Sequence, residues 1–173
     1  DCDCALQWSN AHPEEMGISA IVMSGESGGG NLALATTLQA KRAGRIGSIQ
    51  GVYAMCPYIF GAYANPPGHL LSLQENDGYT LNCSLMSTLV KVYDQDLLNA
   101  HNPLAWPYHA APEELSGLPP HIISVNELDP LRDEGLVLFR KLLAAGNSAT
   151  ARIVPATNHA GDLSFPDVAP EPY

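Results

Sequence analysis

The sequence of 173 residues predicts a single α/β domain, spanning 1–173, with a mainly parallel sheet and flanking helices. Apolar, partly β-branched runs recur at residues 18–24, 51–58, 121–125 and 150–155. Their hydrophobicity is continuous rather than alternating, which is typical of strands that are covered on both faces. Helical patterns follow the first three runs, so we expect parallel strands joined by helical crossovers.

A Gly-x-Ser-x-Gly motif occupies residues 25–29, where the first apolar run leads into a helix expected over residues 31–41. This arrangement is the nucleophile elbow of serine hydrolases, in which a sharp turn exposes the serine hydroxyl above the sheet. The flanking glycines let strand and helix approach without a Cβ clash. The N–H groups at the start of the helix face the position where an oxyanion would develop. Ser27 is therefore the candidate nucleophile.

A long segment, residues 59–120, separates the second and third expected strands. It is too long for a plain loop, and we interpret it as an excursion over the active-site edge of the sheet. It contains one helical pattern with apolar residues at i, i+3, i+4 and i+7, namely Met86, Leu89, Val90 and Tyr93. Two further helices are expected at residues 5–11 and 133–145.

A serine nucleophile needs a histidine base, and in enzymes with this elbow the chain order is serine, acid, histidine. Catalytic groups of open α/β sheets collect at the carboxyl ends of the strands. His121 opens a strand and therefore lies at the wrong edge. Four histidines come too early in the chain, namely His12, His69, His101 and His109. His159 alone follows the last strand, which makes it the candidate base.

The orienting acid is expected just beyond the third strand, where Glu127 and Asp129 are both available. Asp129 is favoured because Pro130 holds the turn before the next helix, and Glu127 is the alternative. Asp133 and Glu134 have a plainer interpretation, as acids in the first turn of a helix, stabilised by its dipole.

Composition and charge limit the class of protein. The net charge is −10 and the 8 basic residues are scattered, which argues against nucleic-acid binding. No apolar run approaches the ~20 residues needed to span a bilayer. The four cysteines fit no zinc-site spacing, so we expect no metal, and reduced thiols in a cytoplasmic protein. The chain begins at Asp1, so this interpretation leaves a signal peptide open.

Four stretches resemble the hormone-sensitive-lipase family of α/β-hydrolase esterases, and most closely its bacterial brefeldin A esterase-like branch. They are residues 25–32 (Gly-Glu-Ser-Gly-Gly-Gly-Asn-Leu), 102–107 (Asn-Pro-Leu-Ala-Trp-Pro), 125–135 (Val-Asn-Glu-Leu-Asp-Pro-Leu-Arg-Asp-Glu-Gly) and 159–162 (His-Ala-Gly-Asp). Their order and separations match the family along nearly the whole chain. The resemblance therefore implies an α/β-hydrolase fold.

The same resemblance implies a function. Ser27, Asp129 and His159 would form a catalytic triad, and Gly28 would give one oxyanion N–H. The substrates would be short-chain carboxylic esters, hydrolysed through an acyl-enzyme without a cofactor. Trp106 is a candidate to line the substrate pocket, as is Tyr108, although packing of the 59–120 segment on the sheet explains both equally well.

The sequence also departs from the family. Family members carry a His-Gly-Gly-Gly segment upstream that completes the oxyanion hole, and no such segment occurs here. The chain resembles the later half of such an enzyme, so we expect residues 1–173 alone to hydrolyse esters slowly. An inactive fragment or a hydrolase-like ligand-binding protein is the alternative. An unpaired edge at residues 18–24 would favour self-association.

Overall fold

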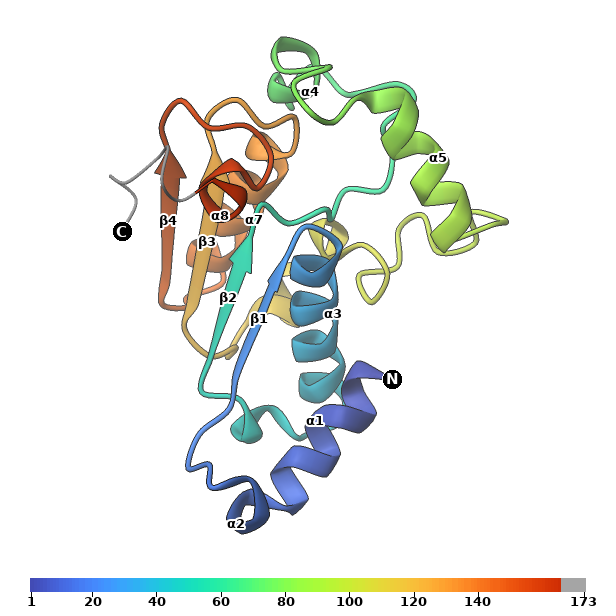
Figure 1. The fold of residues 1–173 in the computed structure, drawn as a ribbon. Helices are drawn as coiled ribbons and strands as arrows, with labels where there is room; N and C mark the ends of the chain where they lie inside the picture. The colour runs from blue at the N-terminus through green and yellow to red at the C-terminus, as the bar shows by residue number, and fades with distance from the viewer. Residues whose placement is uncertain (166–173) are drawn as a thin grey trace.

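Four parallel strands form one sheet, in the order β1-β2-β3-β4, in the computed structural model, which describes residues 1–165 (Figure 1). The strands are β1 (Val22–Glu26), β2 (Gly51–Met55), β3 (His121–Asn126) and β4 (Ala149–Val154). Every neighbouring pair is parallel, as the continuous apolar runs predict. The expected α/β class with a parallel sheet is confirmed.

Helices connect these strands and extend beyond them. The longer helices are α1 (Cys2–Ala11), α3 (Gly28–Arg42), α5 (Cys83–Tyr93) and α7 (Arg132–Ala144). Short helical turns are α2 (Pro13–Met16), η1 (Ile46–Ser48), α4 (Ser72–Glu75), η2 (Pro107–His109), α6 (Pro112–Leu115) and α8 (Gly161–Ser164). All four helices expected from the sequence are present, each extended or shifted by one to three residues at its ends.

The first two strands differ in extent from the sequence prediction. The apolar run predicts a first strand at residues 18–24, but β1 begins only at Val22, opposite Gly51 at the start of β2. Residues 18–21 have no strand beside them, since the chain before Gly51 forms the η1 turn. The second predicted strand reaches residue 58, whereas β2 ends at Met55. Cys56 has a positive φ of 35°, and Pro57 lacks an N–H for the ladder.

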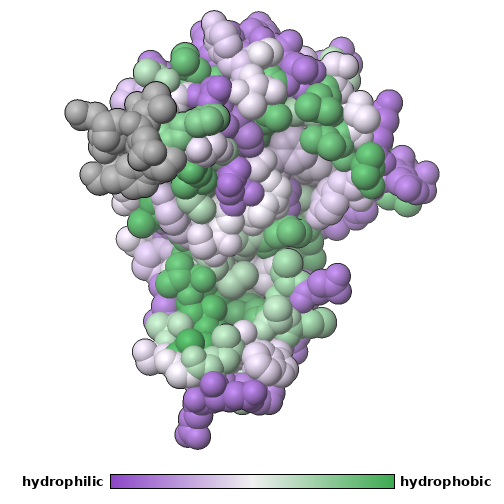
Figure 2. Space-filling model, in the orientation of Figure 1, coloured by the Kyte–Doolittle hydropathy of each residue, from purple (hydrophilic) through white to green (hydrophobic). Residues whose placement is uncertain are grey.

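Helices α3 and α7 cover the same face of the sheet, α3 against β1 and β2 and α7 against β3 and β4 (Figure 1). The core between these layers is apolar and includes Leu34, Leu38, Val52, Ala54, Ile123, Val125, Leu138 and Leu142. The opposite face leaves Val22 and Ile122 58% and 47% exposed. Hydrophobic surface gathers over the strands on this side (Figure 2). Within residues 1–165, the helices therefore cover mainly one face of the sheet, whereas the continuous apolar runs predict strands covered on both faces.

The 59–120 segment leaves the sheet after β2 and returns at β3. Its helices α4 and α5 lie beyond the carboxyl ends of the strands (Figure 1). Asn82 caps α5 by accepting a hydrogen bond from Leu85 N at 2.8 Å. Met86 and Val90 are buried, whereas Leu89 and Tyr93 are about half exposed. The amphipathic pattern thus places one side of α5 against the body of the protein.

The interpretation of Glu134 as a plain first-turn acid, stabilised by the helix dipole, is wrong, because its carboxyl group is buried and hydrogen-bonded. Its side chain is 1% exposed, and its Oε1 accepts hydrogen bonds from Ile59 N (2.6 Å), Phe60 N (3.1 Å) and the Tyr63 hydroxyl (3.0 Å). Burial raises the pKa of Glu134 to about 8, against the opposing effect of these hydrogen bonds. Glu134 therefore anchors the start of the 59–120 segment to α7.

The structure also bears on membrane spans and on disulfides. No helix within residues 1–165 is long and apolar enough to cross a membrane. All four cysteines are free thiols.

Candidate active site

Ser27 lies in a sharp turn between β1 and α3. Its backbone has φ 54° and ψ −117°, a conformation that non-glycine residues rarely adopt. The Ser27 N–H donates to Met55 O at 2.9 Å, and Ser27 O accepts from Asn31 N and Tyr58 N. These hydrogen bonds to the neighbouring strand end hold the strained residue in place. The geometry is that of the elbow which the Gly-x-Ser-x-Gly motif predicts.

Glycine is required at Gly25 and is favoured by close packing at Gly30. A Cβ on Gly25 would lie 2.2 Å from Gly29 O, which no side chain tolerates. A Cβ on Gly30 would lie 3.1 Å from Pro57 Cβ. Gly28, by contrast, has open space where a Cβ would lie, so its place at the first turn of α3 is not set by close packing. Its N–H belongs to the first turn of the helix, where backbone N–H groups lack intrahelical partners.

Asp129 and His159 meet at the carboxyl edge of the sheet. Asp129 follows β3 and is fully buried, and its Oδ2 lies 2.8 Å from His159 Nδ1. Its other oxygen accepts a hydrogen bond from Leu131 N at 2.9 Å. Glu127, the alternative acid, instead accepts from Ala156 N at 2.7 Å. The geometry therefore pairs His159 with Asp129 and assigns Glu127 to the loop after β4.

The electrostatics of His159 follow from this pairing. Burial of the ring lowers the pKa of His159, but hydrogen bonds with the Asp129 and Cys56 side chains raise it more strongly. The net shift of the His159 pKa is upward from its ordinary value. A buried carboxylate on Nδ1 stabilises the imidazolium and leaves Nε2 available to a proton donor.

The loop that carries His159 reaches the elbow. A ring nitrogen of His159 lies within 4.8 Å of a carboxylate oxygen of Glu26, the residue before Ser27. Within the described part of the chain, Ser27 Oγ takes part in no hydrogen bond. Hydrogen bonds between catalytic groups are often long in unliganded sites and tighten when a substrate binds. The three candidate residues thus occupy one edge of the sheet, with the Asp129–His159 contact already formed.

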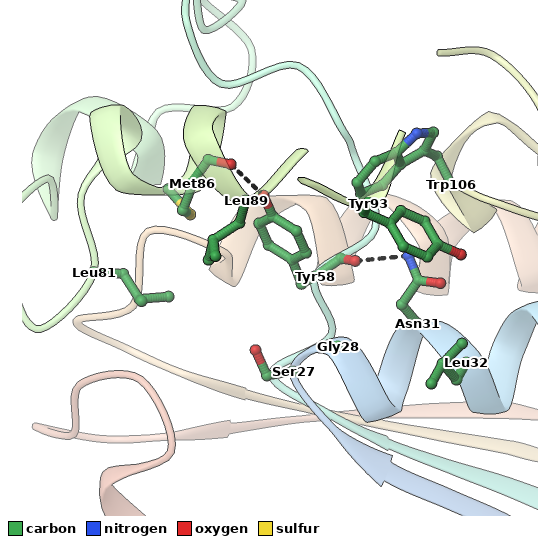
Figure 3. A pocket seen from close by; sticks show the side chains of 10 residues that line it. All are labelled: Ser27, Gly28, Asn31, Leu32, Tyr58, Leu81, Met86, Leu89, Tyr93 and Trp106. Atoms are coloured by element: carbon green, nitrogen blue, oxygen red, sulfur yellow. Dashed lines mark hydrogen bonds between the residues drawn. The ribbon is translucent and has the colours of Figure 1, made fainter. Parts of the chain in front are cut away.

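A largely apolar cavity of about 310 Å³ opens beside Ser27 (Figure 3). Ser27 projects from the elbow toward the space below α5, with Tyr58 above it and Asn31 to its right in this view. The lining residues are Ser27, Gly28, Asn31, Leu32, Tyr58, Leu81, Met86, Leu89, Tyr93 and Trp106. The cavity therefore lies between the elbow and the 59–120 segment, and both contribute to its wall.

Three hydrogen bonds fix the wall of this cavity. Asn31 Nδ2 donates to Tyr58 O at 2.9 Å and to Ala105 O at 2.8 Å. The Tyr58 hydroxyl donates to Met86 O at 2.6 Å, which connects the loop after β2 to α5 (Figure 3). Burial, with a smaller effect of the charge of Glu134, raises the Tyr58 pKa far above its usual range, so the hydroxyl stays protonated.

The two aromatic residues proposed as pocket lining differ in position. Trp106 is fully buried and lines the cavity, in edge-to-face contact with Tyr58 and Tyr93. Tyr108 does not border this cavity, which corrects the expectation. Its hydroxyl is hydrogen-bonded to His69 Nε2 at 2.9 Å, and its ring packs edge-on against Phe60. Packing within the 59–120 segment accounts for Tyr108.

Several cavity residues carry no clear signal in the sequence. The local pattern indicates Asn31 only as part of a helix, and Tyr58 only as the end of a strand. Leu81 gives no signal, because nothing in its local sequence says where the 59–120 segment folds. Met86, Leu89 and Tyr93 do belong to a recognised amphipathic pattern, but that pattern indicates a buried helix face and not which cavity it borders.

Comparisons with known proteins agree with this geometry. Residues 1–162 match the family model described as the alpha/beta hydrolase fold. An arylesterase of Saccharolobus solfataricus is 33% identical over 149 residues, covering 84% of this chain and 46% of the relative. Carboxylesterase NlhH of Mycobacterium tuberculosis is 30% identical, covering 98% of this chain and 52% of the relative.

Solved structures show the same likeness. Brefeldin A esterase, described as a bacterial homologue of human hormone-sensitive lipase, superposes with a TM-score of 0.95 at 48% identity, covering 98% of this chain and 48% of that one. Esterase Est22 gives a TM-score of 0.83 at 44% identity, covering 97% of this chain and 50% of that one. The chain thus spans about half the length of the relatives that it matches.

Proposed function

Because the chain belongs to the α/β-hydrolase-fold family, we propose that the protein hydrolyses carboxylic esters, with Ser27 as nucleophile, His159 as general base and Asp129 as the acid that orients it. The observation that carries the proposal is the 2.8 Å contact between buried Asp129 and His159, at the same sheet edge as the strained turn of Ser27. The esterase names of the relatives support the reaction class.

The proposed reaction has two halves. Ser27 Oγ attacks the ester carbonyl while His159 Nε2 takes its proton, and the histidine then returns that proton to the leaving alcohol. Water, deprotonated by the same histidine, attacks the acyl-enzyme, and the histidine then returns this proton to Ser27 Oγ as the carboxylic acid leaves. The Gly28 N–H and the start of α3 stabilise the negative charge on the carbonyl oxygen in both halves.

The cavity beside Ser27 supports a preference for small apolar acyl groups. A volume of about 310 Å³ is at the lower end of the range for small-molecule sites. Its walls are formed mainly by Leu32, Leu81, Met86, Leu89 and Trp106 side chains. An acyl chain there would gain burial without requiring a charged partner. Short-chain esters are therefore the proposed substrates.

Ser27→Ala in the complete protein tests this function. We expect hydrolysis of p-nitrophenyl acetate to fall by at least about 10⁴-fold. Covalent labelling by a fluorophosphonate should disappear together with activity. Ser24→Ala is the matched control, since Ser24 is an exposed serine three residues earlier on β1, and its activity and labelling should be unchanged.

Two results would contradict the assignment. Unchanged turnover in Ser27→Ala would remove Ser27 from the reaction. Binding of esters by the parent protein without turnover or labelling would instead favour a hydrolase-like ligand-binding protein.

The compartment is part of the proposal. Four free thiols, two of them separated by a single residue near the start of α1, support a reducing environment such as the cytoplasm.

A further inference from the structure

Three side chains with metal-binding chemistry meet at the elbow. Glu26 ends β1, Cys56 directly follows β2, and His159 lies in the loop after β4. One carboxylate oxygen, the thiol sulfur and one ring nitrogen all lie within 4.8 Å of one another. We propose that these three residues form a zinc-binding site, and that zinc bound there blocks the use of His159 as a base.

The donor set suits zinc in particular. A thiolate, an imidazole and a carboxylate are the three side-chain types that bind Zn²⁺, whereas Mg²⁺ and Ca²⁺ require oxygen donors. In a tetrahedral site with normal bond lengths, such donors lie about 3.3–3.6 Å apart. Since the three atoms lie within 4.8 Å of one another, the contraction needed is at most about 1.5 Å. Glu26 is exposed, so its side chain can move by that amount without disturbing the core.

Cys56 is held firmly in this position. It is 2% exposed and has a positive φ of 35°, an unusual conformation for a residue with a side chain. The Cys56 N–H donates to Ser124 O at 2.7 Å, which fixes this backbone against β3. Its thiol forms no disulfide. A buried sulfur on a fixed backbone, beside an imidazole, is a preorganised ligand.

His159 already has the outer contact of a metal ligand. Asp129 accepts at Nδ1, at 2.8 Å, and leaves Nε2 as the coordinating nitrogen. Carboxylate–histidine–zinc arrangements of this kind fix the ring orientation and increase the basicity of the ligand. Three protein ligands leave the fourth tetrahedral position for a water molecule.

The consequence for catalysis rests on the proposed function, whereas metal binding does not. A metal on Nε2 occupies the lone pair that would accept the Ser27 proton. Zinc should therefore inhibit ester hydrolysis reversibly and without any covalent change. Free enzyme would be recovered when a chelator removes the ion.

Cobalt(II) is the probe for the site, because a Co²⁺–thiolate bond gives an intense ultraviolet charge-transfer band. We expect the complete protein to develop this band at one equivalent of Co²⁺ and to lose it when Zn²⁺ is added. Cys56→Ser should abolish the band and weaken Zn²⁺ binding by at least about 100-fold, since loss of even an outer-shell partner costs 10–100-fold. Cys83→Ser is the matched control, because Cys83 lies on α5 and its variant should keep both band and affinity.

Activity provides the second measurement. Zn²⁺ should inhibit hydrolysis of p-nitrophenyl acetate at the concentration that displaces Co²⁺, and EDTA should restore it. Absence of the band, or a band that persists in Cys56→Ser, would overturn the site. Full turnover with the site saturated by Zn²⁺ would overturn the blocking of His159. A band in a protein that hydrolyses no ester would support the metal site and remove the proposed function instead.

Discussion

Two regions of the molecule border Ser27, and different forces hold them. The loops at the strand ends are fixed by polar contacts, such as Asp129 with His159 and Ser27 N with Met55 O. The 59–120 segment contains the larger apolar cluster, around Trp106, together with polar contacts to the body of the protein, such as Ile59 N with Glu134 and Asn31 with Ala105 O. Polar contacts depend on individual atoms, whereas apolar packing tolerates change if volume is kept. The reaction should therefore be sensitive in the first region, and stability and selectivity in the second.

Among these polar contacts, replacing Asp129 should lower the activity most. Asp129→Asn should lower kcat for p-nitrophenyl acetate by about 10³–10⁴-fold while the fold is retained, because an amide does not orient or stabilise the imidazolium. The acidic limb of the kcat/KM pH profile should also move to lower pH, since Asp129 raises the His159 pKa. Circular dichroism and pH–rate measurements test both.

Glu127→Gln is the control for that experiment. Glu127 lies two residues earlier but contacts Ala156 N and not His159. Its variant should keep kcat within a few-fold. If Glu127→Gln loses as much activity as Asp129→Asn, the pairing of Asp129 with His159 is not the one used in catalysis.

Trp106→Ala should produce the largest loss of stability in the 59–120 segment. Trp106 is fully buried, and it packs so closely on Gly61 that a Cβ there would lie 2.4 Å from the indole ring. We expect the free energy of unfolding to fall by about 3–5 kcal/mol in urea denaturation. Trp8→Ala, at a half-exposed tryptophan, should cost less than about 1 kcal/mol. Equal losses would show that the segment does not depend on this packing.

Glu134 should make stability depend on pH. Its folded pKa of about 8 exceeds the ordinary value of 4.5, so the folded state holds a proton that the unfolded state loses. This contribution is complete below pH 4.5 and is lost as pH rises to 8, with a slope of at most about 1.4 kcal/mol per pH unit. Glu134→Gln should remove that slope. The exposed Glu113→Gln should retain it, and a wild-type slope in Glu134→Gln would contradict the burial effect.

Leu89→Trp should have the smallest effect, because it should change only the preference between short and longer acyl chains. Leu89 lines the cavity from α5, so a larger side chain reduces the space for the acyl group. We expect kcat/KM for the hexanoate ester to fall about tenfold relative to acetate. Val92→Trp, on an exposed position of the same helix, should leave the ratio unchanged. A parallel loss for both esters would mean that the acyl chain does not enter this cavity.

The sequence predicted much of the strand-end region. The Gly-x-Ser-x-Gly motif located the elbow, and the order of strand ends indicated His159 as the candidate base and favoured Asp129 over Glu127 as the acid. It could not predict that Cys56 turns out of β2 with a positive φ. Nor could it place Glu134, whose partners Ile59, Phe60 and Tyr63 lie more than 70 residues earlier in the chain.

By itself, the sequence determined the α/β class, the approximate positions of the strands and the candidate residues proposed for ester hydrolysis. Hydrophobic periodicity and turn motifs are local, so one chain is enough to reveal them. The tertiary structure decided which residues surround the elbow: Trp106 but not Tyr108 beside Ser27, and Glu26, Cys56 and His159 together. These neighbours come from distant segments, and only packing and long-range hydrogen bonds bring such segments into contact.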